Sequence, residues 1–72
     1  MTEQEAVEIA RRVAEQEGWA WVEPAEAILR KSWLGRDPRW EVSSCWLGGM
    51  VRLIIDDETG RVLEKDYRHL LR

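Results

Sequence analysis

The chain has 72 residues, of which 44% are hydrophobic and 35% are charged, a composition typical of one small soluble domain spanning residues 1–72. Its net charge of −3 argues against general nucleic-acid binding, which requires a broad positive field. The N-terminus lacks the pattern of a signal peptide, and no run approaches the roughly 18 apolar residues that span a bilayer, so we expect a cytoplasmic protein. Because a chain this short buries only about 60% of its unfolded surface, dimerisation would be a natural supplement.

Residues 3–17 are predicted to form an amphipathic helix. Thr2 followed by Glu5 fits a capping box, and Gly18 is placed to end the helix in the left-handed conformation. Glu8 and Arg12 are spaced for an ion pair one turn apart. Apolar residues recur at helical spacing along one side and predict the face that packs on the core. This stripe consists of Ala6, Ile9, Ala10, Val13 and Ala14.

Residues 25–35 are ambiguous between helix and strand, because both spacings nearly fit the apolar positions. The segment has no good N-cap, and the dipeptide Glu23-Pro24 favours extended backbone before it. We prefer a strand, followed by a loop at residues 35–38. The alternating positions of that strand are Ala27, Leu29, Lys31 and Trp33.

Residues 40–57 predict a β-hairpin with Gly48-Gly49 as a two-residue loop. In that register Trp46 opposes Val51, and Val42 opposes Ile55. The apolar alternation favours the same pairing, because opposed residues share a face of the sheet. One face then holds Trp40, Val42, Trp46, Val51, Leu53 and Ile55, and the other holds Glu41, Ser43, Cys45, Leu47, Met50, Arg52, Ile54 and Asp56.

A third strand of the meander is predicted from Arg61 to about Lys65, after a turn over residues 57–60. Leu63 would lie opposite Ile55, although a one-residue slip would put Val62 there. Residues 66–72 are expected to add a turn of helix or to fray. The predicted fold class is α+β, with one N-terminal helix packed on a three- to four-stranded antiparallel meander sheet.

The order of these elements resembles that of PepSY-type small α+β domains. The likeness rests on residues 6–10, Gly18, residues 39–42, the strand at 51–56 and the Thr-Gly-Arg-Val-Leu run at 59–63. It implies a helix on an antiparallel sheet that acts without catalysis, by binding and sometimes inhibiting a protease or another protein. Small stand-alone bacterial domains of this order include some immunity proteins of polymorphic toxins.

Few residues offer chemistry. Cys45 and His69 are the sole thiol and imidazole, and their predicted positions give them no reason to meet, so we expect no enzymatic activity. The acids of residues 56–58 fail the spacing of a calcium-binding loop, and structural zinc needs more ligands than one cysteine and one histidine. We therefore expect neither a metal nor a cofactor.

A partner surface is predicted on the sheet face that a single short helix leaves uncovered. Exposed apolar side chains edged by charge are typical of protein interfaces, including self-association, and an acidic helix beside a basic middle segment favours a selective protein partner. The expected anchors are tryptophans and arginines, namely Trp33, Arg39, Trp40, Trp46 and Arg52.

An alternative function is binding of single-stranded nucleic acid. Basic side chains would follow the phosphates, and two indoles would stack on the bases. The residues for this role are Arg30, Lys31, Arg36 and Arg39, with Trp33 and Trp40.

Overall fold

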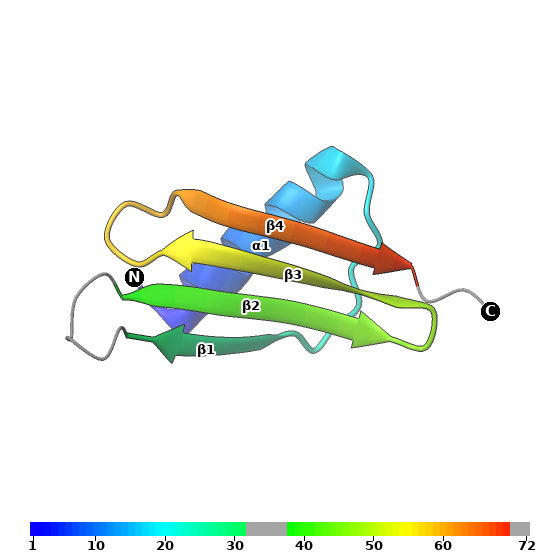
Figure 1. Ribbon diagram of the computed structural model, residues 1–72, viewed down its shortest axis with the longest axis horizontal. Helices are drawn as coiled ribbons and strands as arrows, with labels where there is room; N and C mark the ends of the chain where they lie inside the picture. The colour runs from blue at the N-terminus through cyan, green and yellow to red at the C-terminus, as the bar shows by residue number, and fades with distance from the viewer. Residues whose placement is uncertain (32–37, 70–72) are drawn as a thin grey trace.

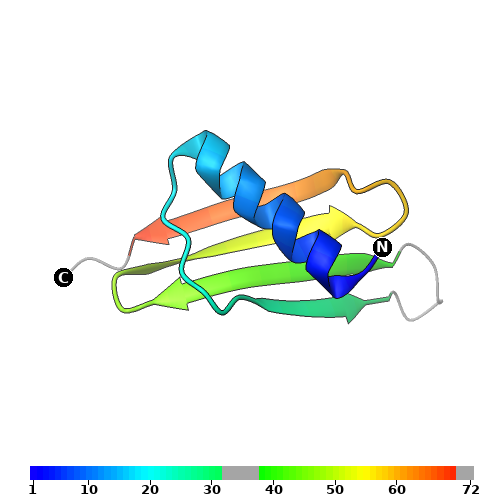
Figure 2. The same ribbon diagram turned by 180° about the vertical axis from the view of Figure 1, so that it is seen from behind.

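The computed structural model describes residues 1–31 and 38–69 and forms two layers, a helix on one face of a four-stranded antiparallel sheet (Figures 1 and 2). The strands follow one another in the order β1-β2-β3-β4, so the sheet is a meander and the predicted α+β class is confirmed. Within the described ranges no helix has the length and apolar character that a membrane span requires. The elements are α1 (Glu3–Glu17), β1 (Glu26–Arg30), β2 (Arg39–Trp46), β3 (Gly49–Asp56) and β4 (Val62–His69).

Both ends of α1 follow the sequence prediction. The Thr2 hydroxyl accepts the Glu5 amide, and the Glu5 carboxylate accepts the Thr2 amide, which completes the capping box. Gly18 ends the helix with φ 77° and ψ 20°, a conformation that glycine adopts without strain. Three alanines of the predicted stripe are fully buried against the sheet, which lets the helix lie close to the strands. They are Ala6, Ala10 and Ala14.

The β2–β3 hairpin has the predicted faces but a different register. Val42 pairs with Leu53 and Trp40 with Ile55, a shift of two residues from the expected pairing. Because side chains alternate with a period of two, this shift leaves every residue on its predicted face. Beneath α1 the core is formed by Trp40, Val42, Val51, Leu53 and Ile55, with the Ala6 and Ala10 methyls above them.

The shift moves the hairpin loop to Leu47-Gly48 and places Gly49 in β3, opposite Trp46. A Cβ at residue 49 would lie 2.5 Å from the Arg68 carbonyl oxygen and 3.0 Å from the Trp46 ring. Gly49 is therefore required for the close approach of an indole and a neighbouring strand, not for the turn.

The segment between α1 and β1 completes the cover over the sheet. In Figure 2 it crosses the same face as the helix, from the β4 side to β1. Trp19 and Trp21 of this segment pack against the core, and the Trp19 ring stacks on Tyr67 of β4 at 5.3 Å. The buried Ser44 hydroxyl fixes the segment to β2, since it accepts the Val22 amide at 3.0 Å and donates to the Val22 carbonyl at 2.6 Å.

The two outer strands differ in part from the prediction. Strand β1 confirms the extended interpretation of residues 26–30. Residues 32–37, which include Trp33 and most of the predicted loop, lie outside the described residues.

Strand β4 continues to His69, so the expectation of a helical or frayed segment is wrong for residues 66–69. Tyr67 explains the difference, because its ring packs between Trp19 and Trp46. Val62 pairs with Ile55, and Leu63 forms a bulge.

The neighbouring glycines of the hairpin give a matched pair of variants. Gly49→Ala is expected to lower the free energy of unfolding by about 2–3 kcal/mol, because the added methyl collides with a main-chain oxygen that moves only if β3 and β4 separate. Gly48→Ala has ordinary contacts, 3.4 Å at the nearest, and we expect a change of about 0.5 kcal/mol or less. Urea denaturation of the two variants measures both values, and equal losses would contradict the register.

Candidate functional site

No described element covers the sheet face opposite α1, and we call this face the open face. Figure 1 views the molecule from this side, with α1 behind the strands. Met50 and Ile54 lie on this face and are partly buried among charged side chains. The charged members are Glu26 and Arg30 of β1, Arg39 and Glu41 of β2, Arg52 and Asp56 of β3, and Glu64, Asp66 and Arg68 of β4.

A row of ion pairs crosses the middle of the open face. The Glu41 carboxylate accepts hydrogen bonds from Nε of Arg30 at 2.5 Å and from Nε of Arg52 at 2.7 Å, and thereby joins three strands. These hydrogen bonds lower the pKa of Glu41 below its ordinary value, and the bond from Arg52 has the larger effect. The charges here are therefore held in fixed positions, and the carboxylate stays ionised under mildly acidic conditions.

The basic end of the open face lies where β1 ends and β2 begins. Arg39 is exposed there, and Arg30 is 63% exposed despite its pair with Glu41. Both arginines border a shallow hollow of about 440 Å³ that also reaches Ile54 and Glu64. Three of the six lining residues are arginines and one is the aliphatic Ile54, so the hollow is suited to an acidic side chain of a partner.

The five residues predicted as partner anchors occupy different surroundings. Arg39 and Arg52 lie on the open face, whereas Trp40 is only 8% exposed and lies beneath α1. Trp46 is also on the helix side, partly buried against Tyr67. Trp33 lies outside the described residues. The structure thus places Arg39 and Arg52 on one face, and it places Trp40 and Trp46 on the other. A partner cannot reach Trp40 unless α1 moves.

The residues suggested for nucleic-acid stacking are divided in the same way. Arg30, Lys31 and Arg39 are exposed near one end of the sheet, while Arg36 and Trp33 lie outside the described residues. The buried Trp40 offers no ring face to a base, and Arg30 is already paired with Glu41. This surface lacks a described aromatic platform of the kind that single strands use.

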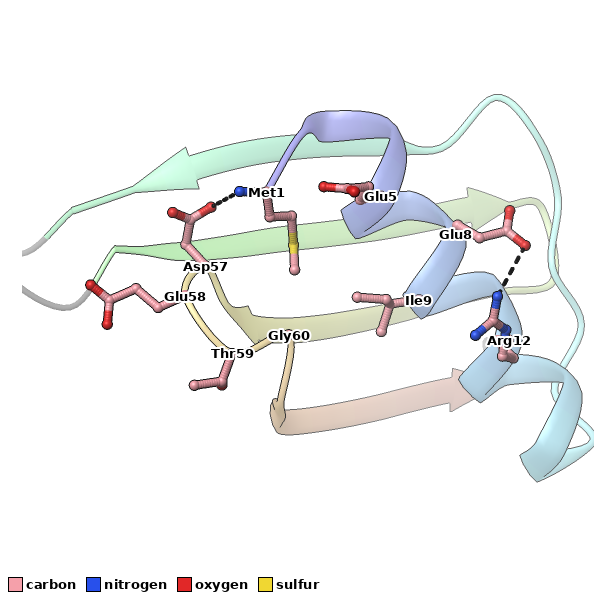
Figure 3. Close-up of a pocket in the computed structure, with 9 residues that line it drawn as sticks. All are labelled: Met1, Glu5, Glu8, Ile9, Arg12, Asp57, Glu58, Thr59 and Gly60. Carbon is pink, nitrogen blue, oxygen red and sulfur yellow. Dashed lines mark ion pairs between the residues drawn. The ribbon is translucent and has the colours of Figure 1, made fainter.

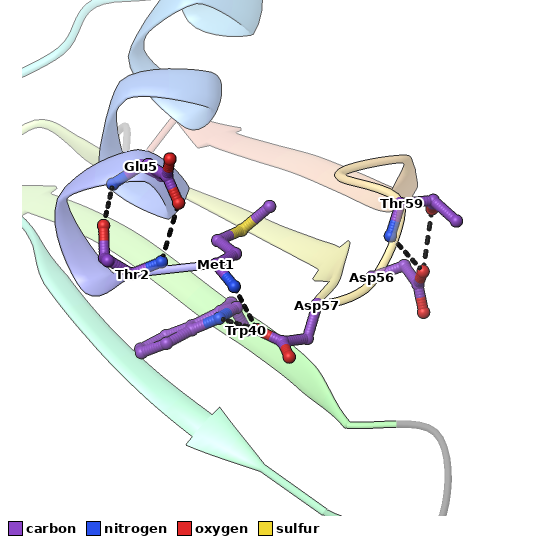
Figure 4. Close-up of polar contacts among 7 residues, drawn as sticks. All are labelled: Met1, Thr2, Glu5, Trp40, Asp56, Asp57 and Thr59. Carbon is purple, nitrogen blue, oxygen red and sulfur yellow. Dashed lines mark hydrogen bonds and ion pairs between the residues drawn. The ribbon is translucent and has the colours of Figure 1, made fainter.

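Asp57 holds the N-terminus of α1 to the sheet (Figure 4). Its Oδ1 accepts the Trp40 indole N–H at 2.7 Å and lies 3.6 Å from the N-terminal ammonium group. In the adjoining turn the Asp56 carboxylate accepts both the amide and the hydroxyl of Thr59, which lowers the pKa of Asp56. Two of the three acids that suggested a metal loop, Asp56 and Asp57, therefore have structural partners.

A hollow of about 500 Å³ between α1 and the β3–β4 turn is the other candidate site (Figure 3). Its lining includes Ile9, Glu5, Glu8 and Asp57. Glu5 belongs to the capping box, Glu8 pairs with Arg11 and Arg12, and Asp57 holds the indole of the core tryptophan. Most of the charge in this hollow is committed to holding the helix in place.

Cys45 and His69 lie on opposite faces of the sheet. Cys45 is exposed on the open face, whereas His69 lies beside Tyr67 on the helix side, with ring centroids 6.0 Å apart. Their placement gives no nucleophile and base pair. Across residues 1–31 and 38–69 no group of three or more potential ligands is arranged to hold a metal ion.

Comparison of the chain with models of protein families, with curated proteins and with solved structures finds no match. The functional argument therefore depends on the geometry of the chain itself.

The contact between Asp57 and Trp40 yields a test with a conservative control. Asp57→Ala leaves the indole N–H without its acceptor in a partly buried position, and we expect the free energy of unfolding to fall by about 1–3 kcal/mol. Asp57→Asn keeps an oxygen acceptor and loses only the weak ion pair with the N-terminus, so it is expected to retain most of that stability. Chemical denaturation followed by tryptophan fluorescence measures both, and equal losses would contradict the role of the hydrogen bond.

Proposed function

We propose that the chain is a small non-catalytic domain that binds another protein through the open face of its sheet. The observation that carries this proposal is the unequal cover of the two faces. One face is packed beneath α1 and the segment that follows it, while the other holds Met50 and Ile54 among charged side chains with no described element over them. Partly apolar surfaces with a charged rim are typical of protein interfaces.

The distribution of charge on the open face supports a selective partner. Cations gather at the end formed by Arg30, Lys31 and Arg39. On the same face, Glu64 and Asp66 of β4 supply acids at the opposite edge of the sheet. The ion pairs of Glu41 hold Arg30 and Arg52 in fixed positions, so these two side chains lose less conformational entropy when a partner binds. A partner with acidic groups over β1 and β2 fits this pattern best.

An inhibitory or immunity-type role in the bacterial cytoplasm is the finer form of the proposal. It draws its support from the resemblance of the element order to PepSY-like domains and from a site that offers charge and shape without paired catalytic groups. In such a role the domain would act by covering a surface of its target.

Affinity capture with matched charge reversals tests the proposal. The tagged chain serves as bait in a lysate of the native host, and captured proteins are then purified and titrated against the bait. Arg39→Glu reverses a charge on the open face, whereas Arg12→Glu makes the same change on the exposed side of α1. We expect Arg39→Glu to weaken the interaction about tenfold or more, because interface arginines contribute strongly to affinity, and Arg12→Glu to leave it unchanged.

Two results would contradict the open face as the binding surface. One is a purified partner that binds Arg39→Glu as tightly as the parent chain. The other is the absence of any protein that binds the parent more tightly than an unrelated bait, together with salt-dependent binding of single-stranded oligonucleotides, which would favour the nucleic-acid alternative.

A further inference from the structure

The two edges of the sheet are protected to very different degrees. An edge strand presents unpaired main-chain donors and acceptors that can pair with another strand, and proteins block such edges with charges and bulges. Strand β4 has both devices, with a bulge at Leu63 and charged residues at four of its eight positions. The charged positions are Glu64, Lys65, Asp66 and Arg68.

Strand β1 is less protected, because it has no bulge and only two charged residues. Its register with β2 is regular from Glu26 to Arg30, and its charged residues stand only at the two ends. Between them Ile28 and Leu29 are 42% and 40% exposed, so the strand presents two neighbouring aliphatic side chains to solvent. In Figures 1 and 2 no drawn element lies along the outer side of this strand.

The order of residues in β1 indicates what would pair with it. The strand reads Glu-Ala-Ile-Leu-Arg, which is complementary to itself when two copies run antiparallel about Ile28. Glu26 then faces Arg30 of the second copy at both ends, and the two Ile28 side chains meet at the centre. Opposite charges and apolar pairs placed across from each other each stabilise an antiparallel ladder.

We propose that the chain forms a symmetric dimer through the free edge of β1, with the two-fold axis at Ile28 and one continuous eight-stranded sheet. The axis is perpendicular to the sheet, so both helices lie on one side and the two open faces join on the other. Glu26 has no ion-pair partner among the described residues. Arg30 pairs with Glu41 through Nε, yet its side chain is 63% exposed, so in the dimer it would meet Glu26 of the second copy as well. The dimer proposal does not depend on the proposed function, because it rests on the main-chain edge of β1 and not on a partner of the open face.

A second copy of β1 matches all five positions of the strand. An extended peptide from another protein could pair with the same edge, but it would need its own acid and base at matching positions. The small contact predicts a weak dimer, with a dissociation constant on the order of 10–100 μM.

Sedimentation equilibrium from about 10 μM to several hundred micromolar, with charge reversals at the two ends of β1, tests the pairing. The parent chain is expected to approach twice the mass of one chain. Glu26→Arg and Arg30→Glu should each remain monomeric, because each places like charges opposite one another in the dimer. An equimolar mixture of the two variants should dimerise again, since every cross-strand pair is then of opposite charge. A loss of folding cannot produce this rescue.

Two features of the chain keep these variants interpretable. Arg30→Glu loses the ion pair with Glu41, but position 30 also faces Arg39 in the register with β2, so the new carboxylate has a cation beside it in its own chain. Position 26 faces the neutral Ser43, so Glu26→Arg breaks no ion pair among the described residues. Leu47→Lys is the matched control for removing exposed apolar surface. It alters the most exposed large aliphatic side chain among the described residues, in the β2–β3 loop, and is expected to leave the dimer unchanged.

Disulfide trapping in a Cys45→Ser background tests the register. Paired residues of antiparallel strands have Cα atoms about 4.5–5.5 Å apart, which is within disulfide range. Ile28→Cys should therefore form a covalent dimer rapidly on mild oxidation. Glu26→Cys should not, because the two copies of position 26 lie about 14 Å apart.

Three results would overturn the proposal. They are a parent chain that stays monomeric at several hundred micromolar, a mixture of the two charge variants that fails to associate, and a faster disulfide at position 26 than at position 28. The last result, or association of the parent with a foreign peptide only, would assign the edge to a different pairing.

Discussion

The structure depends on the close packing of one helix against one face of the sheet. Ala6, Ala10 and Ala14 are fully buried, and their small side chains bring α1 near the strands, so that the alternate residues of β2 and β3 beneath it become the core. A single short helix covers one face only, and the remaining residues of the same strands must face away from it. The open face, with its fixed row of ion pairs, is thus the direct consequence of how the core is made. The functional proposal rests on this division.

The tryptophans show how residue type differs from role. An exposed indole is a strong interface anchor, but a domain of this size also needs large side chains to fill its interior. Here Trp19 and Trp21 extend the cover where the helix ends, Trp40 donates to Asp57, and Trp46 packs against Tyr67. Binding by the open face therefore depends on arginines, with Ile28, Met50 and Ile54 as the apolar contribution. Edge pairing depends on the separate sequence of β1.

Local signals were sufficient to predict much of the fold, and they failed where distant contacts decide. The capping box, the glycine at the end of α1 and the alternation in the hairpin are local, and the structure has all three. The register slipped by two residues because alternation fixes which face a residue occupies but not its partner across the sheet. That partner is set by the fit of Gly49 against Trp46 and the β4 main chain. Likewise, the extension of β4 depends on the stack of Tyr67 with Trp19, 48 positions away along the chain. The sequence alone did not predict the Arg30–Glu41–Arg52 row, because these three residues meet only in the observed register of β1, β2 and β3.

The division of the sheet into a core face and a charged face is tested most directly by proton NMR. Main-chain NOEs across the hairpin should link Val42 with Leu53 and Ser44 with Val51, and side-chain NOEs should connect the Ala10 methyl with this core. NOEs that instead link Val42 with Ile54 would shift the strands by one residue and put Arg52 on the same face as Val42, and Glu41 on the same face as Leu53 and Ile55. Such a result would contradict the account, because each face would then mix core and charged residues and neither could be the apolar core.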